Sequence, residues 1–114
     1  MNHDMISELV AWIETQLSTK LTIDKVASRS GYSKWHLQRA YLKSTGMTLG
    51  EYIRRRQLSC AAAELRLTRS GVIDVAMKYG FSSQQTFTRS FREFFGQPPG
   101  RYRRVSEWDC SQLV

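Results

Sequence analysis

The sequence contains one unit twice, and this repeat constrains the possible folds more than any other feature. At an offset of 49, Val26-Ala27 and Gly31-Tyr32-Ser33 recur as Val75-Ala76 and Gly80-Phe81-Ser82. After one inserted residue the offset becomes 50, and it pairs Leu37, Arg39, Tyr41, Gly46, Gly50 and Tyr52 with Phe87, Arg89, Phe91, Gly96, Gly100 and Tyr102. A repeat of this kind predicts one structural unit that is used twice.

Each copy has the features of a helix-turn-helix. Apolar residues recur at helical spacing on both sides of a tight turn that contains Gly, an aromatic residue and Ser. A short helix, a turn of three or four residues with glycine and a second helix make up that unit. No alternating strand pattern competes with this interpretation.

About seven helices are expected along the chain. Their ranges are 5–17, 23–30, 34–45, 49–67, 72–79, 83–95 and about 98–105. Candidate N-caps are Thr22, Ser33, Thr48 and Ser82, and the last two have Glu51 and Gln85 at capping-box spacing. The fold is therefore predicted to be all-α, with two helix-turn-helix lobes (1–46 and 69–105) joined by a linking helix (47–68). Residues 106–114, which include Trp108, are expected to form a tail.

The charge points to a polyanionic partner. The 114 residues include 17 Lys and Arg against 10 Asp and Glu, which gives a net charge of +7. Residues 34–104 hold 14 of the basic residues and only four acidic ones, whereas residues 1–33 hold three basic and four acidic residues. A small, strongly basic chain favours nucleic acid as the partner. The positive field begins at Lys34, so the first helix is not expected to face the nucleic acid.

Several other functions are not expected. No run of 18 apolar residues is present, and the N-terminus does not resemble a secretory signal, so we expect neither a membrane span nor export. Cys60 and Cys110 have no metal-ligand spacing, which predicts free thiols, a cytoplasmic protein and no cofactor. Cys60 is expected to be a small core residue. With only His3 and His36 and no catalytic motif, the chain is not expected to be an enzyme.

The second helix of each unit is predicted to enter a DNA major groove. The helix at 34–45 should bury Leu37 and Tyr41, and the helix at 83–95 should bury Phe87, Phe91 and Phe94. The opposite faces carry Trp35, Gln38, Arg39 and Leu42 in one copy and Gln85, Thr88, Arg89 and Arg92 in the other. Arg can bond guanine with two parallel hydrogen bonds, Gln can do the same to adenine, and Thr or Trp can meet a thymine methyl.

Other basic groups are candidates for phosphate contacts, which add affinity but carry no sequence information. One or two residues of Arg54-Arg55-Arg56 could reach phosphate while another pairs with Glu51. Helix N-termini add backbone N–H donors. The phosphate candidates are Lys34, Arg55, Ser83, Arg92, Arg101, Arg103 and Arg104.

Three segments resemble the AraC/XylS family of bacterial transcription regulators, and most closely its small MarA/SoxS/RamA-type branch. They are Gly31 to Arg39, Tyr79 to Arg89 and Pro98 to Arg103. The resemblance covers about residues 6–105. It implies that base contacts come from Trp35, Gln38 and Arg39 in the first lobe and from Gln84, Gln85, Thr86, Thr88 and Arg89 in the second.

The resemblance also implies a function. It implies monomeric binding to asymmetric promoter sites, activation through RNA polymerase, and control of genes for drug efflux, permeability and oxidative stress. The chain shows no effector domain, so ligand control is not expected and activity should follow protein amount. Two alternatives remain open, namely a polymerase-binding module that does not recognise DNA and a promoter-specific repressor. The repeat could also be structural alone.

Overall fold

The computed structural model describes residues 3–104, and every regular element in that range is a helix. The helices are α1 (His3–Thr15), α2 (Ile23–Ser30), α3 (Lys34–Thr45), α4 (Leu49–Leu67), α5 (Val72–Lys78), α6 (Gln84–Phe95) and α7 (Pro99–Arg104). The prediction of an all-α fold with two helix-turn-helix units is confirmed. None of these seven helices has both the length and the apolarity that crossing a bilayer requires.

The long helix α4 contributes to two separate hydrophobic cores. Leu49 and Ile53, in its first half, pack with buried residues of α1, α2 and α3. Leu58 and Leu65, in its second half, pack with buried residues of α5, α6 and α7. We call α1–α3 the first lobe and α5–α7 the second lobe, and α4 belongs to the cores of both.

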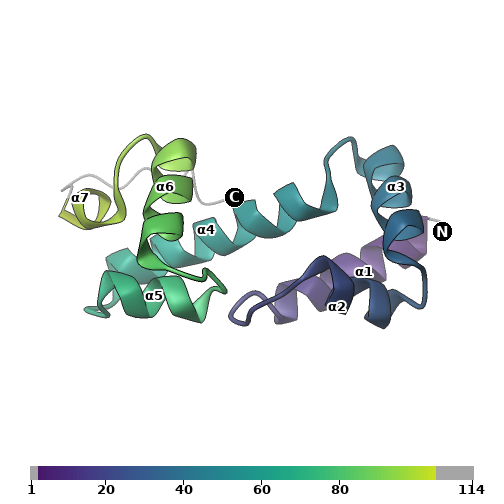
Figure 1. Ribbon diagram of the computed structural model, residues 1–114, viewed down its shortest axis with the longest axis horizontal. Helices are drawn as coiled ribbons and strands as arrows, with labels where there is room; N and C mark the ends of the chain where they lie inside the picture. Colours follow the sequence, from purple (N-terminus) through teal and green to yellow (C-terminus); the bar gives the residue numbers. More distant parts are fainter. Residues whose placement is uncertain (1–2, 105–114) are drawn as a thin grey trace.

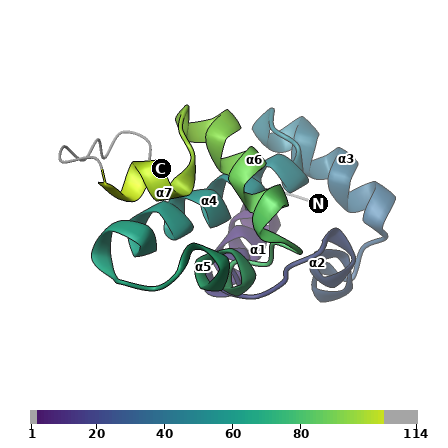
Figure 2. The ribbon, with the colours of Figure 1, turned by 60° about the vertical axis from the view of Figure 1, so that its left-hand side comes forward.

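The two lobes present their second helices on the same side of α4. Figure 1 shows α3 and α6 near opposite ends of α4, both on the upper side of this view. Figure 2, turned by 60°, shows α3 and α6 along one side of the molecule, with α1, α2 and α5 along the opposite side. The molecule is elongated, at 44 × 25 × 21 Å.

Side-chain caps fix where the helices begin. Thr22, Ser33 and Thr48 accept hydrogen bonds from backbone N–H groups three residues later, as predicted. The predicted cap Ser82 is wrong by one residue, because the hydroxyl of Ser83 accepts the N–H of Thr86 at 3.1 Å. Helix α6 therefore begins at Gln84 rather than at Ser83.

An ion pair joins the first helix to α4. The Glu14 carboxylate accepts a 2.6 Å hydrogen bond from the Tyr52 hydroxyl and hydrogen bonds from Arg56 Nε and Nη2 at 3.0–3.2 Å. The expected pair with Glu51 is not found among residues 3–104, and the arginine of this run that forms an ion pair is Arg56, with Glu14 of α1. Partial burial acts to raise the pKa of Glu14, but the hydrogen bonds from Arg56 and Tyr52 outweigh it and hold the pKa below its ordinary value.

A second polar cluster joins α4 to α5. Glu64 accepts hydrogen bonds from Lys78 Nζ at 2.6 Å and from the Tyr79 hydroxyl at 3.1 Å. Burial and the hydrogen bond to Glu64 raise the pKa of Tyr79 to about 12, so its hydroxyl stays protonated and donates at neutral pH. Each lobe therefore attaches to α4 through one glutamate that a tyrosine and a cation share.

Arg103 has a structural role that differs from the phosphate contact expected of it. Its Nε donates to the Leu65 carbonyl at 2.8 Å, and its Nη2 donates to the Ser70 carbonyl. These carbonyls belong to the end of α4 and the turn that follows, where helix geometry leaves acceptors without partners. Its neighbours Arg101 and Arg104 are exposed. The contacts of Arg103 therefore favour a role in holding α7 against α4.

Cys60 lies between the two cores. It packs against buried residues of both lobes but is only half-buried. The expectation is therefore corrected: Cys60 lies at the edge of both cores rather than inside one. Burial raises the pKa of its thiol, more strongly than the Arg56 charge lowers it. The thiol is therefore mainly protonated at neutral pH, as is typical of an unreactive cysteine.

We expect Glu14→Gln to lower the free energy of unfolding by about 1 kcal/mol at pH 7, as a partly exposed ion pair contributes. The folded-state pKa of Glu14 lies below its ordinary 4.5. The contribution of the pair is therefore present above that value and is lost as the pH falls through the lower, folded-state pKa. Urea unfolding at pH 7 and pH 3 measures it, with Glu8→Gln, an exposed carboxylate on the same helix, as the control. An equal difference at both pH values would contradict the ion-pair account.

We expect Arg103→Ala to lower the free energy of unfolding by about 1–3 kcal/mol, because two backbone acceptors lose a charged donor. Arg101→Ala is the matched control, since it removes an exposed arginine of the same helix. Its effect should stay within about 0.5 kcal/mol. Thermal unfolding of both variants makes the comparison, and equal stability of the two would exclude the structural role of Arg103.

Candidate nucleic-acid interface

The exposed face of α3 carries the residues predicted for the first lobe. Trp35 is 66% exposed, and Gln38 and Arg39 are also exposed. The Arg39 guanidinium lies 5.1 Å from the centre of the Trp35 ring, a cation–π contact. This contact restrains the arginine without occupying its hydrogen-bond donors, so Arg39 remains able to bind a base edge.

The buried face of α3 fixes the direction of that exposed face. Leu37 and Tyr41 are buried in the first core, as predicted. At the N-terminus, Ser33 caps the helix and the His36 ring stacks on Tyr32 at 5.0 Å between centroids. Lys34, predicted to contact phosphate, forms an exposed ion pair with Asp24 at 3.3 Å. Such a pair is weak in water and can exchange for a phosphate.

The exposed face of α6 brings together most of the residues predicted for the second lobe. Gln84, Gln85, Thr88, Arg89, Arg92 and Glu93 line one shallow hollow on this helix. All of these side chains are exposed except Thr88, which is half-buried. Amide, hydroxyl and guanidinium groups on one helix face can recognise base edges.

Thr86 does not share that face. It is half-buried and lines the cleft between the lobes, together with residues of α4 and the loop before α2. Its Oγ1 accepts a 3.0 Å hydrogen bond from the Ser83 hydroxyl. The hydroxyl of Ser83, a phosphate candidate, already caps the helix. A phosphate at this position would therefore bind the backbone N–H groups of the first turn.

The aromatic core of the second lobe sets the position of α6. Phe87 and Phe91 are fully buried, as predicted, and their rings pack 5.5 Å apart between centroids. Phe94 is only half-buried, which corrects the prediction that it is buried. The reason is that its ring lies at the edge of the core, where the Arg55 guanidinium covers it at 5.4 Å.

Basic side chains also lie between α3 and α6, which we call the two candidate recognition helices. Arg54 and Arg55 are exposed on the first half of α4 and line a hollow between α4 and α6. Glu93 lines the same hollow, and it adds an acidic group that the sequence analysis did not single out. The repeat could have identified it, because at the offset of 50 Glu93 in α6 is the equivalent of the basic Lys43 in α3.

Both recognition helices have N-termini suited to an anion. Neither α3 nor α6 has an acidic residue in its first turn. The partial positive charge of each helix start is therefore not neutralised from within the helix, and free N–H groups remain there. Arg101 and Arg104 of α7 are exposed as well, so their side chains are available for the predicted phosphate contacts.

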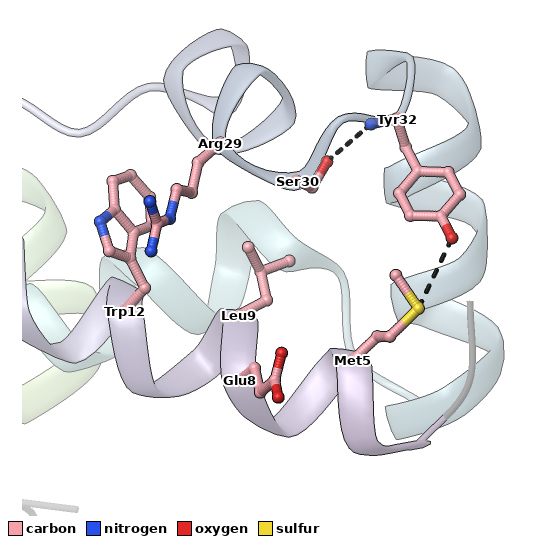
Figure 3. Close-up of a pocket in the computed structure, with 7 residues that line it drawn as sticks. All are labelled: Met5, Glu8, Leu9, Trp12, Arg29, Ser30 and Tyr32. Atoms are coloured by element: carbon pink, nitrogen blue, oxygen red, sulfur yellow. Dashed lines mark hydrogen bonds between the residues drawn. The ribbon is translucent and has the colours of Figure 1, made fainter.

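A separate pocket lies on the first lobe, and no predicted site residue lines it. It has a volume of about 210 Å³ and lies between α1 and α2, as Figure 3 shows. The Arg29 guanidinium lies 5.6 Å from the centre of the Trp12 ring, and the Tyr32 hydroxyl donates to Met5 Sδ at 3.6 Å. Its lining residues are Met5, Glu8, Leu9, Trp12, Arg29, Ser30 and Tyr32.

Known proteins similar to this chain include transcriptional regulators. Residues 26–105 match the family described as a helix-turn-helix domain. The chain is 51% identical over 106 residues to the transcriptional regulator Rob of Salmonella typhimurium, covering 93% of this chain and 37% of Rob. It is 50% identical over 104 residues to the regulatory protein SoxS of Escherichia coli, covering 90% of this chain and 97% of SoxS. The chain thus spans little more than a third of Rob and nearly all of SoxS.

Solved structures show the same arrangement of helices. The DNA-binding domain of AdpA, determined in complex with a target DNA, has a TM-score of 0.76 and 26% identity, over 85% of this chain and 87% of that domain. The two helix-turn-helix units, the family match and these relatives together show that the chain belongs to the AraC family of helix-turn-helix transcriptional regulators, in the branch of SoxS and Rob.

Proposed function

We propose that this protein binds promoter DNA as a monomer, with α3 and α6 in adjacent segments of the major groove. One observation carries the proposal: two equivalent helices stand on the same side of α4, and both expose polar and cationic side chains. If these helices were only structural, nothing would require polar and cationic side chains at equivalent exposed positions in both copies of the repeat. The structure of the similar AdpA domain in complex with a target DNA supports DNA as the partner.

The proposed base contacts follow from side-chain chemistry. Arg39 and Arg89 occupy equivalent positions and can each bond guanine O6 and N7. Gln38 and Gln85 can each bond an adenine, and Trp35 offers an apolar face for thymine methyls. Because most of the matched positions hold different side chains, the two lobes should recognise unlike half-sites. Gln84 and Thr88 lie on the same exposed face of α6 and complete the proposed set. Thr86, which the family resemblance also implies, lies off this face in the cleft between the lobes and is left out of the set.

The proposed phosphate contacts come from the margin of this face. Lys34, the start of α6 at Ser83, and Arg92 flank the recognition helices, Arg55 lies between them, and Arg101 and Arg104 extend the margin along α7. Phosphate contacts strengthen binding to every sequence and make it depend on salt. Arg103 is left out of this proposed set, because its Nε and Nη2 already donate to the backbone carbonyls of Leu65 and Ser70.

We further infer that the protein activates transcription through RNA polymerase at stress and drug-resistance genes, as its membership of the SoxS and Rob branch suggests. Transcription with purified polymerase on a bound promoter tests this directly. Increased transcript supports activation, and decreased transcript supports a promoter-specific repressor. Binding to polymerase without sequence-selective binding to DNA would favour the interaction-module alternative and contradict the proposal.

Arg39→Ala and Arg89→Ala should each reduce discrimination at one base position by about 1–3 kcal/mol, in different half-sites. The reason is that each change removes one bidentate contact to a base. Binding to a set of single-base variants of a selected site measures this, and Arg69→Ala, an exposed arginine on the turn after α4, is the control. An equal loss of affinity on every variant would show that these arginines contact phosphate instead.

One monomer should protect about two turns of DNA and bend it toward the protein. Helix α4, which joins the lobes, has 19 residues and spans about 28 Å, whereas successive major-groove faces on straight DNA are about 34 Å apart. The line from α3 to α6 does not follow the axis of α4, but the shorter length favours lobes that are too close for straight DNA. Bending a site of this length by about 40–90° costs about 1–6 kcal/mol. Stoichiometric titration and circular-permutation gel shifts measure both properties. A dimer on a palindrome would contradict monomeric binding, and a straight duplex with both half-sites protected would contradict the bend.

A further inference from the structure

The two lobes approach each other closely at Gly80, beside Gln57 in the middle of α4. Among the described residues, the first-lobe helices pack on one another and on α4 and make no comparable contact with α5–α7. Figure 1 shows the loop between α1 and α2 approaching the turn between α5 and α6. A cleft of about 460 Å³ lies next to this point, with walls from both lobes. The relative placement of α3 and α6 therefore depends on α4 and on this contact.

Gly80 makes the contact from the side of the second lobe. A Cβ atom on Gly80 would lie 2.9 Å from the Thr19 carbonyl oxygen and 3.1 Å from Lys20 Cα. Both of these atoms are backbone, so no side-chain rotation could relieve the overlap. Any larger residue at Gly80 would have to move the second lobe away from the first.

Gln57 holds the opposing loop in place. The residue is buried, with an exposure of 8%, and its Nε2 donates to the carbonyls of Leu17 at 3.2 Å and Thr19 at 3.1 Å. The Thr19 carbonyl thus lies between the amide of Gln57 and Gly80. A buried polar group with two satisfied hydrogen bonds fixes local geometry, since breaking them leaves unpaired carbonyls.

The repeat supplies an internal comparison. Gly31 occupies the position in the first lobe that Gly80 occupies in the second, and both have left-handed backbone, with φ of 80° and 85°. A Cβ on Gly31, however, would meet no atom within 4 Å. The conformation of the turn requires glycine in both copies, but only Gly80 also contacts the other lobe. Close approach at Gly80 therefore has a role beyond forming the turn.

We propose that Gln57, Gly80 and the Thr19–Lys20 backbone form an inter-lobe latch that fixes the separation of the two recognition helices. The latch sets the half-site spacing that the protein accepts, and this inference rests on the proposed function. Gln57 and Gly80 are thus positioning residues, which act through the placement of α3 and α6 and do not touch DNA.

Binding to DNA with altered half-site spacing tests the latch. A site selected by the wild-type protein is remade with one or two base pairs added or removed between its half-sites. The wild-type protein should prefer one spacing by about tenfold or more, the range of a single unfavourable change in a site. Gly80→Ala should reduce that preference below about threefold or move its optimum by one base pair. Gly31→Ala, which imposes similar backbone strain without the overlap, should keep the wild-type preference.

Gln57→Leu gives an independent test if Gly80→Ala does not fold. It keeps a similar side-chain volume, removes both donations to the loop and should also reduce the spacing preference. In free protein, the distance distribution between spin labels on unnatural residues at Ser28 and Asp74 should broaden in Gln57→Leu and not in Gly31→Ala.

The outcomes separate the latch from the function on which it rests. A wild-type protein that selects no sequence would contradict the proposed function. A wild-type protein that selects a sequence but tolerates every spacing would contradict the latch alone. Unchanged spacing preference in Gln57→Leu and in folded Gly80→Ala would also overturn the latch while leaving the proposed DNA contacts in place.

Discussion

The structure depends on one helix that is buried along two different stretches. The first half of α4 completes the core of one lobe with Leu49 and Ile53, and its second half completes the other with Leu58 and Leu65. Neither lobe could bury its apolar residues without its half of α4, because each lobe alone is very small. The helix that joins the lobes is therefore also what folds them, and it places α3 and α6 on one side of the molecule.

Interactions at the lobe boundaries add rigidity to this arrangement. Glu14 and Glu64 attach α1 and α5 to α4 through a tyrosine and a cation each, and Arg103 attaches α7 to the end of α4. None of these polar groups lies on the exposed faces of α3 or α6. The base-facing side chains are thus free to differ between lobes, while the contacts that hold the helices stay on the other faces.

The sequence predicts well where the helices lie and which side chains of α3 and α6 are exposed, because both follow from local patterns. Glycine stops, capping residues and the 50-residue repeat identify α2 to α6 within one or two residues, and Ser82 is misassigned only because Ser83 offers an equivalent hydroxyl. Contacts between elements are not local. Nothing in the pattern around Arg103 or Arg56 shows that their partners lie 33 to 42 residues away. Gly80 likewise has the same sequence signal as Gly31 and a different environment.

Tethered cleavage tests the central claim, that one chain places two helices in adjacent major-groove segments, most directly. Iron chelates are attached in turn at Lys43 on α3 and at the matched, exposed Glu93 on α6, neither of which is assigned a DNA contact, and the protein is bound to DNA at one molecule per site. The account predicts two cleavage centres in the same site, about 10 base pairs apart. Overlapping centres, or cleavage from one helix only, would show that the two lobes do not bind the DNA together and would contradict the account.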